Sequence, residues 1–346
     1  MNENNNKIRV AINGFGRIGR TAFKAGFHSE ELEFVAVNDL ATPEALAALV
    51  KYDTNYGRLD REVSHDEHNI IVDGKKIMVL SEKDPGLLPW KDLNIDVVIE
   101  STGRFVKDGA AKAHIEAGAK RVILSAPAKG GGIKTFILGV NYDNYKGEDV
   151  ISNASCTTNC ISPVIHVLHT VFGVQKAFMS TVHSITAEQA LVDAAPPAEH
   201  SDDLRRGRSA GQNIVPTTTG AAISTTEAIP ELEGVFDGIA FRVPTPVGSI
   251  SNITALLKKP VTKEEVNQAF IDAAKQPFYK GILEVNVDPI VSSDIKGSTA
   301  SAIVDLPFTK VVGGDLVNVL AWYDNEWGYS HRLIEEVIKI GQSLRK

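Results

Sequence analysis

One stretch of sequence decides the fold of the first part of the chain: KIRVAINGFGRIG, from Lys7 to Gly19. Its apolar first half, to Ile12, predicts a buried strand, and the residues after Arg17 predict a helix that runs to about Gly26. Between them lies the pattern G-x-G-x-x-G. Its first glycine permits a tight turn, its second lets the backbone approach a pyrophosphate, and its third lets the helix pack on the strand. We therefore predict that a dinucleotide binds at this helix N-terminus, where free N–H groups stabilise anions.

A second apolar segment indicates which dinucleotide binds. Phe34–Val37 predicts a strand that leads into Asn38 and Asp39. An acidic residue about 20 positions after the glycine motif binds a ribose 2′-hydroxyl and repels a 2′-phosphate. Asp39, followed by apolar Leu40, therefore favours NAD over NADP.

Strands and helices alternate over the first 150 residues. The strand candidates are Ile8–Ile12, Glu33–Val37, Ile70–Val72, Ile77–Leu80, Val97–Glu100 and Arg121–Ser125; the helix candidates are Arg17–Ala25, Pro43–Leu49 and Gly109–Ala117. This pattern predicts an α/β, doubly wound, mostly parallel sheet of the Rossmann type. Since ligands bind outside the carboxyl ends of such strands, Thr102 and Ser125 are candidate cofactor contacts, with turn or capping chemistry as the alternative.

The only two cysteines, Cys156 and Cys160, lie at the start of an apolar helical run that continues to Val171. A cysteine at a helix N-terminus feels the positive end of the helix dipole, which favours the nucleophilic thiolate. Cys156 is therefore the candidate nucleophile. The alternative is that both cysteines are small buried core residues.

The second half of the chain has strands with few helices between them. Strand candidates are Ala177–Val182, Gly238–Val243, Ser249–Leu257 and Leu316–Tyr323; helix candidates are Thr262–Lys275 and Tyr329–Leu344. A long irregular stretch, Ser184 to about Arg208, follows the first strand. We expect an α+β second domain with a mostly antiparallel sheet.

A reactive cysteine combined with a nicotinamide cofactor points to oxidation of an aldehyde through a thioester. Cys156 would add to the aldehyde and His183 would act as the base, because imidazole titrates nearest to neutral pH. A thiolate–imidazolium pair would hold Cys156 ionised. A purely structural role for His183 is the alternative.

Two further segments predict anion sites. The run PTTTG, ending in Thr219 and Gly220, offers hydroxyl groups and a glycine N–H. Arg242 lies inside a predicted strand, where a charge is costly unless it is paired or bound to an anion. An internal salt bridge of Arg242 remains the alternative.

Composition excludes several other classes of protein. The formal net charge of −7 argues against a general polyanion binder, and we expect no dedicated nucleic-acid site. No apolar run reaches membrane-spanning length, and residues 1–6 lack a signal-peptide core. Two cysteines four residues apart are not a disulfide framework. We therefore expect a cytoplasmic protein without a membrane partner.

Motifs along the whole chain resemble those of the phosphorylating glyceraldehyde-3-phosphate dehydrogenase family. The matching segments are INGFGRIGR, VNDL, KYDTNYGRLD, ESTGRF, LSAPAKG, ISNASCTTNC, TVHSIT, DLRRGR, PTTTGAA, FRVPTP and WYDNEWGYSHR. The resemblance implies a homotetramer that uses NAD and inorganic phosphate to convert glyceraldehyde 3-phosphate to 1,3-bisphosphoglycerate. It implies an NAD-binding domain over residues 1–154, onto which a helix at about 327–346 packs back, and a catalytic domain over residues 155–326.

The resemblance also implies roles for individual residues, with Cys156 as the nucleophile and His183 as the base. The NAD contacts would be Gly14, Gly16, Arg17, Ile18, Asp39, Lys83, Thr102, Ser125, Asn325 and Tyr329. The substrate phosphate would bind Thr186, Arg206 and Arg242, and inorganic phosphate would bind Ser155, Thr157, Thr219 and Gly220. No metal site is expected.

This sequence departs from the family pattern mainly after His183. Ala187-Glu188 stands in place of a usual Asn-Asp, and Ala190–Asp202 is longer than expected. The nearest alternative is erythrose-4-phosphate dehydrogenase, which usually lacks the equivalents of Thr186 and of Thr219-Gly220. A cofactor-free thiol hydrolase, or a nucleotide- or RNA-binding protein without catalysis, is a more distant alternative.

Overall fold

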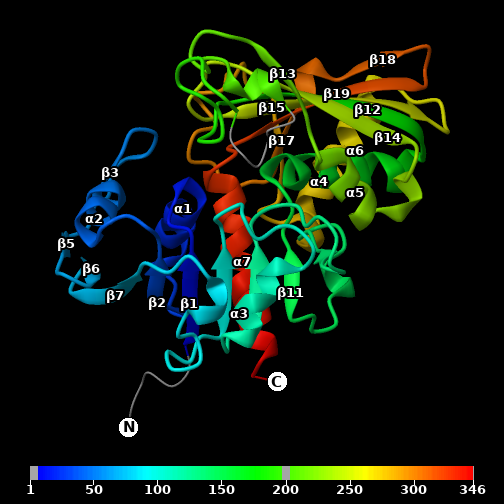
Figure 1. The fold of residues 1–346 in the computed structure, drawn as a ribbon. Coiled ribbons are helices and arrows are strands. Elements are labelled where there is room, and N and C mark those ends of the chain that lie inside the picture. The colour runs from blue at the N-terminus through cyan, green and yellow to red at the C-terminus, as the bar shows by residue number, and fades with distance from the viewer. Residues whose placement is uncertain (1–6, 197–202, 346) are drawn as a thin grey trace. The chain divides into compact units, whose positions relative to one another are not determined.

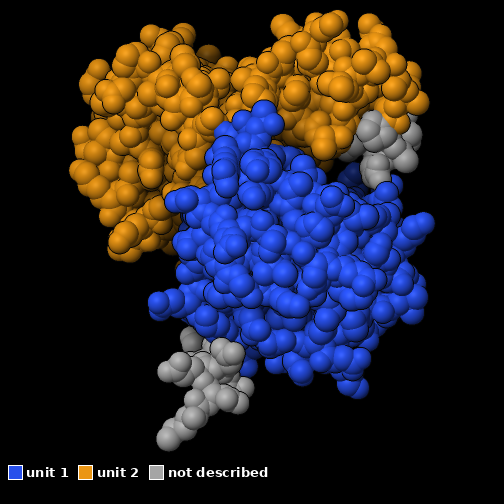
Figure 2. Space-filling view, turned by 90° about the vertical axis from the view of Figure 1, so that its left-hand side faces the viewer, with its two compact units in different colours: residues 1–135, 145–153, 330–346 blue, residues 136–144, 154–329 orange. Residues whose placement is uncertain are grey.

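The computed structural model describes residues 7–196 and 203–345. The chain divides into two compact units, which Figure 2 shows in different colours. Unit 1 comprises residues 1–135, 145–153 and 330–346, and unit 2 comprises residues 136–144 and 154–329. The segment 136–144, which we expected in the first domain, thus groups with unit 2. The predicted loop Ala190–Asp202 lies partly outside the described residues.

Unit 1 contains a nine-stranded sheet in the order β10-β11-β9-β8-β1-β2-β7-β6-β5 (Figure 1). Its strands are β1 (Ile8–Asn13), β2 (Leu32–Asn38), β5 (Val63–His65), β6 (Asn69–Val72), β7 (Lys75–Leu80), β8 (Val97–Glu100), β9 (Arg121–Leu124), β10 (Lys134–Thr135) and β11 (Val150–Ser152). All neighbours are parallel except at the β7-β6-β5 edge. The chain leaves β1 toward β2 and β7 on one side, and later adds β8, β9 and β11 on the other. This reversal of strand order beside β1 is the topological switch point at which doubly wound sheets bind ligands.

The helices of unit 1 are α1 (Arg17–Gly26), α2 (Pro43–Lys51), the short α3 (Ala113–Glu116) and most of α7 (Trp327–Ser343), and a two-stranded ribbon joins β3 (Tyr52–Asp53) to β4 (Gly57–Arg58). The predicted helix over Gly109–Ala117 is instead a 3₁₀ turn, Ala110–Lys112, that runs into α3. The last helix lies against the first elements of the chain: Ser330 Oγ is 2.7 Å from Thr21 Oγ1. A Cβ on Gly341 would lie 2.5 Å from the Ile8 side chain, so close packing of α7 on β1 requires glycine there.

Unit 2 contains an eight-stranded sheet in the order β13-β14-β12-β15-β19-β17-β16, with β18 beside β19. Its strands are β12 (Val174–His183), β13 (Val215–Thr218), β14 (Phe236–Arg242), β15 (Ser249–Leu257), β16 (Leu283–Asn286), β17 (Ala302–Asp305), β18 (Lys310–Val312) and β19 (Leu316–Tyr323). Only β12–β14 and β16–β17 are parallel pairs. The predicted mostly antiparallel second sheet is confirmed.

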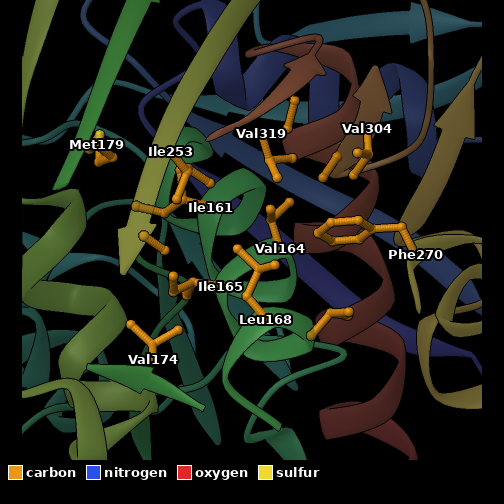
Figure 3. Close-up of a cluster of buried hydrophobic side chains, with 14 of the residues drawn as sticks. Ile161, Val164, Ile165, Leu168, Val174, Met179, Ile253, Phe270, Val304 and Val319 are labelled. Carbon is orange, nitrogen blue, oxygen red and sulfur yellow. The ribbon is translucent and has the colours of Figure 1, made fainter. Parts of the chain in front are cut away.

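The core of unit 2 forms around α4 (Cys156–Phe172), with α5 (Ala221–Ala228) and α6 (Lys263–Lys275) as the other helices. The helix α4 presents Ile161, Val164, Ile165 and Leu168 at the spacing of one helical face, and all four are buried (Figure 3). Residues of β12, β15, β17, β19 and α6 surround them; Figure 3 labels Met179, Ile253, Val304, Val319 and Phe270. This packing fixes the N-terminus of α4, and therefore Cys156, on a rigid element.

Within the described residues, none of the helices combines the length and apolar character that crossing a lipid bilayer requires. The described residues also contain no group of three or more His, Cys, Asp or Glu side chains placed to hold a metal ion.

Candidate active site

A cleft of about 480 Å³ opens in unit 1 at the carboxyl ends of β1, β2 and β8. Five of the predicted cofactor residues line it, namely Gly14, Gly16, Asp39, Lys83 and Thr102. Ser101, another hydroxyl residue expected at this strand end, and Asn38 and Leu40, the neighbours of Asp39, also line it. The sequence analysis did not single out the remaining lining residues, which are Asn13, Glu82, Arg104 and Phe105. What these lining residues share is their position in the sequence. Each of them ends a strand of the parallel sheet or lies a few residues after the end of one.

The glycine loop in this cleft has the geometry that a pyrophosphate site needs. Gly14 has a φ of 91°, and a Cβ there would lie 2.6 Å from the backbone nitrogen of Thr102. A Cβ on Gly16 would meet no protein atom within 4 Å, and Gly16 is the N-cap of α1. The space beside Gly16 therefore admits a ligand against the free N–H groups of a helix N-terminus.

Asp39 holds its carboxylate beside the glycine loop. Its Oδ2 accepts a hydrogen bond of 2.9 Å from the backbone N–H of Phe15, and Oδ1 accepts one of 3.1 Å from Ala41. The carboxylate is thus oriented at the rim of the cleft, where a ribose diol would lie if the pyrophosphate sits at Gly16.

The remaining predicted cofactor residues do not line this cleft. Arg17 forms an ion pair of 2.9 Å with Asp53, Ile18 is half-buried, and Ser125 follows β9 with its N–H bonded to the carbonyl of Glu100. Asn325 and Tyr329 belong to unit 2.

A buried polar network behind the cleft was missed by the sequence analysis. The Glu100 carboxylate accepts hydrogen bonds from Asn13 Nδ2 at 2.6 Å, from Thr102 N at 2.8 Å and from Thr102 Oγ1 at 2.5 Å. His114 Nε2 lies 2.9 Å from its Oε2. Glu100 therefore fixes two residues of the cleft. A carboxylate at the end of an otherwise apolar strand is the signal that could have found it.

In unit 2, Cys156 is the first residue of α4, and Ser155 caps the helix by accepting a 3.1 Å hydrogen bond from Thr158 N. The preceding residue, Ala154, has a φ of 52°, which is uncommon for a residue with a side chain. Cys156 Sγ lies 3.4 Å from His183 Nε2 and is half-buried, whereas Cys160 is fully buried in the core. The structure thus brings together the two residues that the sequence could only propose as partners.

His183 is buried at the end of β12, and its hydrogen bonds set its tautomer. Nδ1 lies 2.7 Å from the carbonyl oxygen of Ser184. Because a carbonyl oxygen can only accept, this contact places the ring proton on Nδ1, so that Nε2 of the neutral ring is the acceptor that faces the Cys156 thiol.

Burial is the largest influence on the protonation of both groups. It raises the pKa of the Cys156 thiol to about 11 and lowers the pKa of His183 to about 3. The positive charge of Arg242 acts next, and it lowers both pKa values. Desolvation therefore favours the neutral thiol and imidazole, whereas the sequence analysis expected an ion pair. Nε2, at 3.4 Å, is the ring nitrogen of His183 that contacts the thiol.

Arg242 joins the cysteine–histidine pair to a cluster of charges. The parallel register of β12 and β14 pairs Arg242 with His183. Arg242 Nη1 lies 3.0 Å from His183 Nδ1, but two N–H donors do not bond to each other. The N–H groups of Nη1 have acceptors in Thr186 Oγ1 at 3.2 Å and the Ser184 carbonyl at 3.3 Å, and the shorter contact of Nδ1 with Ser184 keeps the ring proton on Nδ1.

Glu188 Oε1 lies 2.8 Å from Arg242 Nη2 and 2.7 Å from Arg206 Nη1. The side chains that the resemblance assigned to one phosphate site therefore do converge; they are Thr186, Arg206 and Arg242. The internal salt bridge that was the alternative for Arg242 is also present.

The four residues predicted to bind inorganic phosphate lie at two helix N-termini. Ser155 and Thr157 begin α4, and Thr219 and Gly220 precede α5; the two helices are in contact, and Ser162 Oγ lies 2.9 Å from Thr225 Oγ1. The Thr157 hydroxyl is buried at 2.9 Å from Tyr323 Oη, and Thr219 Oγ1 accepts from Ala221 N at 3.2 Å.

Asn325 lies close to His183 in unit 2. Its Oδ1 accepts hydrogen bonds from Ser184 Oγ at 2.9 Å, Gly248 N at 3.1 Å and Ser249 Oγ at 3.2 Å. Tyr329 donates to the carbonyl oxygen of Ala154 at 2.9 Å, next to the cap of α4. Both side chains are buried.

Comparison with known proteins agrees with this geometry. Residues 8–108 match the glyceraldehyde 3-phosphate dehydrogenase NAD binding domain, and residues 155–325 match the C-terminal domain of the same family. The chain is 51% identical to a glyceraldehyde-3-phosphate dehydrogenase of Streptomyces coelicolor, over 97% of this chain and 99% of the relative. It is 50% identical to the enzyme of that name from Geobacillus stearothermophilus, over 95% of this chain and 96% of the relative. A chloroplastic relative from Chlamydomonas reinhardtii is 48% identical, over 95% and 87%. The chain therefore belongs to the glyceraldehyde-3-phosphate dehydrogenase family.

Proposed function

We propose that this protein oxidises D-glyceraldehyde 3-phosphate to 1,3-bisphosphoglycerate with NAD and inorganic phosphate. The observation that carries the proposal is the 3.4 Å contact between Cys156 Sγ and Nε2 of His183, in a chain of this family. The intermediates are a hemithioacetal and then a thioacyl-enzyme on Cys156.

The two side chains take part in all three steps: addition to the aldehyde, loss of hydride and attack by phosphate. As Sγ bonds to the aldehyde carbon, its proton passes through Nε2 to the aldehyde oxygen, which gives the hemithioacetal. Nε2 then takes the hydroxyl proton while the electron pair of the C–H bond leaves as hydride. NAD, when bound, accepts that hydride. Hydrogen phosphate then attacks the thioacyl carbon and the C–S bond breaks. The imidazolium proton passes to sulfur, and the proton of the hydrogen phosphate is released to water.

Backbone N–H groups and arginine side chains would stabilise the negative charges that are present or develop in these steps. The N–H of Cys156, at the start of α4, is the proposed donor to the developing oxyanion. Thr186, Arg206 and Arg242 are assigned to the substrate phosphate. Inorganic phosphate is assigned to Ser155, Thr157, Thr219 and Gly220, with the backbone N–H of Thr157 as its donor because the Thr157 hydroxyl bonds to Tyr323.

For the cofactor, the residues that would hold NAD are those of the unit 1 cleft. Gly14 and Gly16 take the pyrophosphate, and Asp39 takes the ribose hydroxyls. Lys83 and Thr102 line the same cleft. The assignments of Arg17, Ile18, Ser125, Asn325 and Tyr329 rest on the family pattern alone, as do the boundaries 1–154 and 155–326 for the NAD-binding and catalytic domains.

We also infer a cytoplasmic homotetramer. The support is the family pattern together with two cysteines that are both free thiols. Light scattering on the purified protein tests the assembly: a mass of four chains supports it, and a monomer contradicts it.

The test of the activity follows absorbance at 340 nm with glyceraldehyde 3-phosphate and NAD, with and without inorganic phosphate. Sustained NADH formation that requires phosphate supports the proposal. Equal rates without phosphate would show that water resolves the thioester, and would contradict the inorganic-phosphate site. The same assay with erythrose 4-phosphate should be much slower, because Thr186 and Thr219-Gly220 are present.

A further inference from the structure

The Glu188 carboxylate lies where the proposed function places the phosphate of the substrate. A single oxygen, Oε1, is 2.7 Å from Arg206 Nη1, 2.8 Å from Arg242 Nη2 and 3.2 Å from Thr186 Oγ1. All three residues assigned to the substrate phosphate thus converge on one acceptor that belongs to the chain itself.

Among the residues that the structure describes, the positive charges of this cluster already have carboxylate partners. Arg206 Nε also pairs with Asp203 Oδ2 at 3.3 Å, so two guanidinium groups face two carboxylates. The side chains of Arg206 and Arg242 are only 7% and 11% exposed, which leaves their interactions weakly screened by solvent. A phosphate dianion that entered beside Glu188 would meet a neutral site and a nearby negative charge.

The guanidinium groups nevertheless keep donors that a single carboxylate oxygen cannot satisfy. Among the residues that the structure describes, Arg242 Nε and Arg206 Nη1 are buried without a well-directed hydrogen bond, although Nη1 is within ion-pair distance of Glu188. A phosphate monoester has three terminal oxygens and can accept from more of these donors than one carboxylate oxygen can.

Glu188 is the member of the cluster that is best placed to move. Its side chain is 34% exposed, against 15% for Asp203, 11% for Arg242 and 7% for Arg206. It lies in irregular backbone after β12, so the carboxylate can turn toward water without crossing the core.

We propose that the Glu188 carboxylate is an internal competitor for the substrate phosphate, filling the anion site in the free protein and leaving it when the phosphate binds. This inference rests on the proposed role of Arg206, Arg242 and Thr186. Glu188 sets the affinity of the site: a dianion can displace the carboxylate, whereas a singly charged anion gains no Coulombic advantage over it. The site thereby selects phosphate monoesters over weaker anions.

The test measures equilibrium binding of glycerol 3-phosphate, an unreactive three-carbon phosphomonoester, by calorimetry. Glu188→Gln keeps the shape of the side chain and removes its charge, and it should bind this probe about tenfold more tightly than the wild type, the effect of one charge-assisted contact. Asp193→Asn is the matched control. Asp193 is an exposed carboxylate of the same irregular stretch that pairs with Arg208, so its loss should leave the affinity unchanged. Equal or weaker binding by Glu188→Gln would overturn the proposal, because Glu188 would then support the arginines.

Two further measurements keep the test decisive if Glu188→Gln folds poorly. Glu188→Asp shortens the side chain by one methylene and should tighten binding by a smaller factor. A crystal structure of the wild type with glycerol 3-phosphate should show Glu188 Oε1 displaced from Arg242; a carboxylate that stays in place would overturn the proposal.

Failure of this inference is distinguishable from failure of the proposed function. If Glu188→Gln bound the probe more tightly but the protein formed no NADH in a phosphate-dependent reaction, the competitor role of Glu188 would be supported and the proposed activity contradicted. If Arg242→Gln bound glycerol 3-phosphate as well as the wild type, the arginines would not form the anion site, and the inference would fall whatever the activity.

Discussion

Two buried histidines, one in each unit, differ in what their ring nitrogens contact. His114 in unit 1 accepts a 2.9 Å hydrogen bond at Nδ1 from Trp90 Nε1, so its proton is on Nε2 and is donated to Glu100. His183 in unit 2 has the opposite tautomer, because Nδ1 bonds to the Ser184 carbonyl. Both ring nitrogens of His114 are thus used inside the network, whereas Nε2 of His183 faces a thiol.

The two networks differ in the groups that the histidine bonds to within each. Around Glu100, the donors and acceptors of Asn13, Thr102, His114 and Trp90 bond to one another and shape the rim of the cleft. Around Cys156, burial moves the pKa values of the thiol and of the imidazole away from their usual ranges. A buried network of hydrogen bonds gives rigidity, whereas strongly shifted pKa values of buried titratable groups are typical of functional sites.

The strongest test of this contrast is Cys156→Ser. The serine hydroxyl fits the site but is a far weaker nucleophile, so we expect turnover to fall by at least about 10³-fold. Binding of NAD and the melting temperature should change little. Activity is read at 340 nm and NAD binding by calorimetry. Substantial residual turnover would contradict the covalent mechanism.

His183→Asn is expected to have the next largest effect. The amide can still donate to the Ser184 carbonyl but has no atom at the position of Nε2, so kcat should fall by about 10²–10⁴-fold, the usual contribution of a general base. The measurement is kcat at saturating substrate, with thermal unfolding as the control. A kcat close to that of the wild type would mean that His183 is not the base and has only a structural role.

His114→Asn is the matched change in unit 1, and it should reverse the pattern. It removes the donor to Glu100 and leaves a buried carboxylate short of one partner, which costs about 2–3 kcal/mol of stability. We expect a lower midpoint of urea unfolding and a kcat within about twofold of the wild type at a temperature where the protein is folded. A large fall in kcat without loss of stability would break the comparison.

The smallest effect concerns Arg242, whose positive charge lowers the pKa of Cys156. Arg242→Gln removes that charge, so the thiol pKa should rise, by about one unit for a partly desolvated cation. Because the thiolate is the reactive form, alkylation of Cys156 by neutral iodoacetamide should become slower at neutral pH, and its pH profile should move upward. A profile that moves downward would mean that Arg242 acts on Cys156 through His183.

Much of the fold was predictable because its signals are local. The glycine motif and the alternation of strands and helices predicted the parallel sheet of unit 1, and strands with few helices between them predicted the mostly antiparallel sheet of unit 2. Short edge strands such as β5, β10 and β18 were missed, because a strand of two or three residues is too short to show an alternation of apolar and polar side chains. The predicted helix over Gly109–Ala117 was too long, since the chain there begins as a 3₁₀ turn.

The sequence by itself determined which residue types are available for chemistry: a cysteine at a helix start, a histidine at a strand end, an arginine within a strand and a glycine turn. Only the tertiary structure decided that the cysteine, the histidine and the arginine meet. Cys156 and His183 are 27 positions apart, and His183 and Arg242 are neighbours because of the register between β12 and β14. The tautomer of His183 and the desolvation of Cys156 depend on burial. The ion pairs of Glu188 with Arg206 and Arg242 depend on contacts between segments that are distant in the sequence. No local pattern encodes them, because they arise only when non-local packing excludes water.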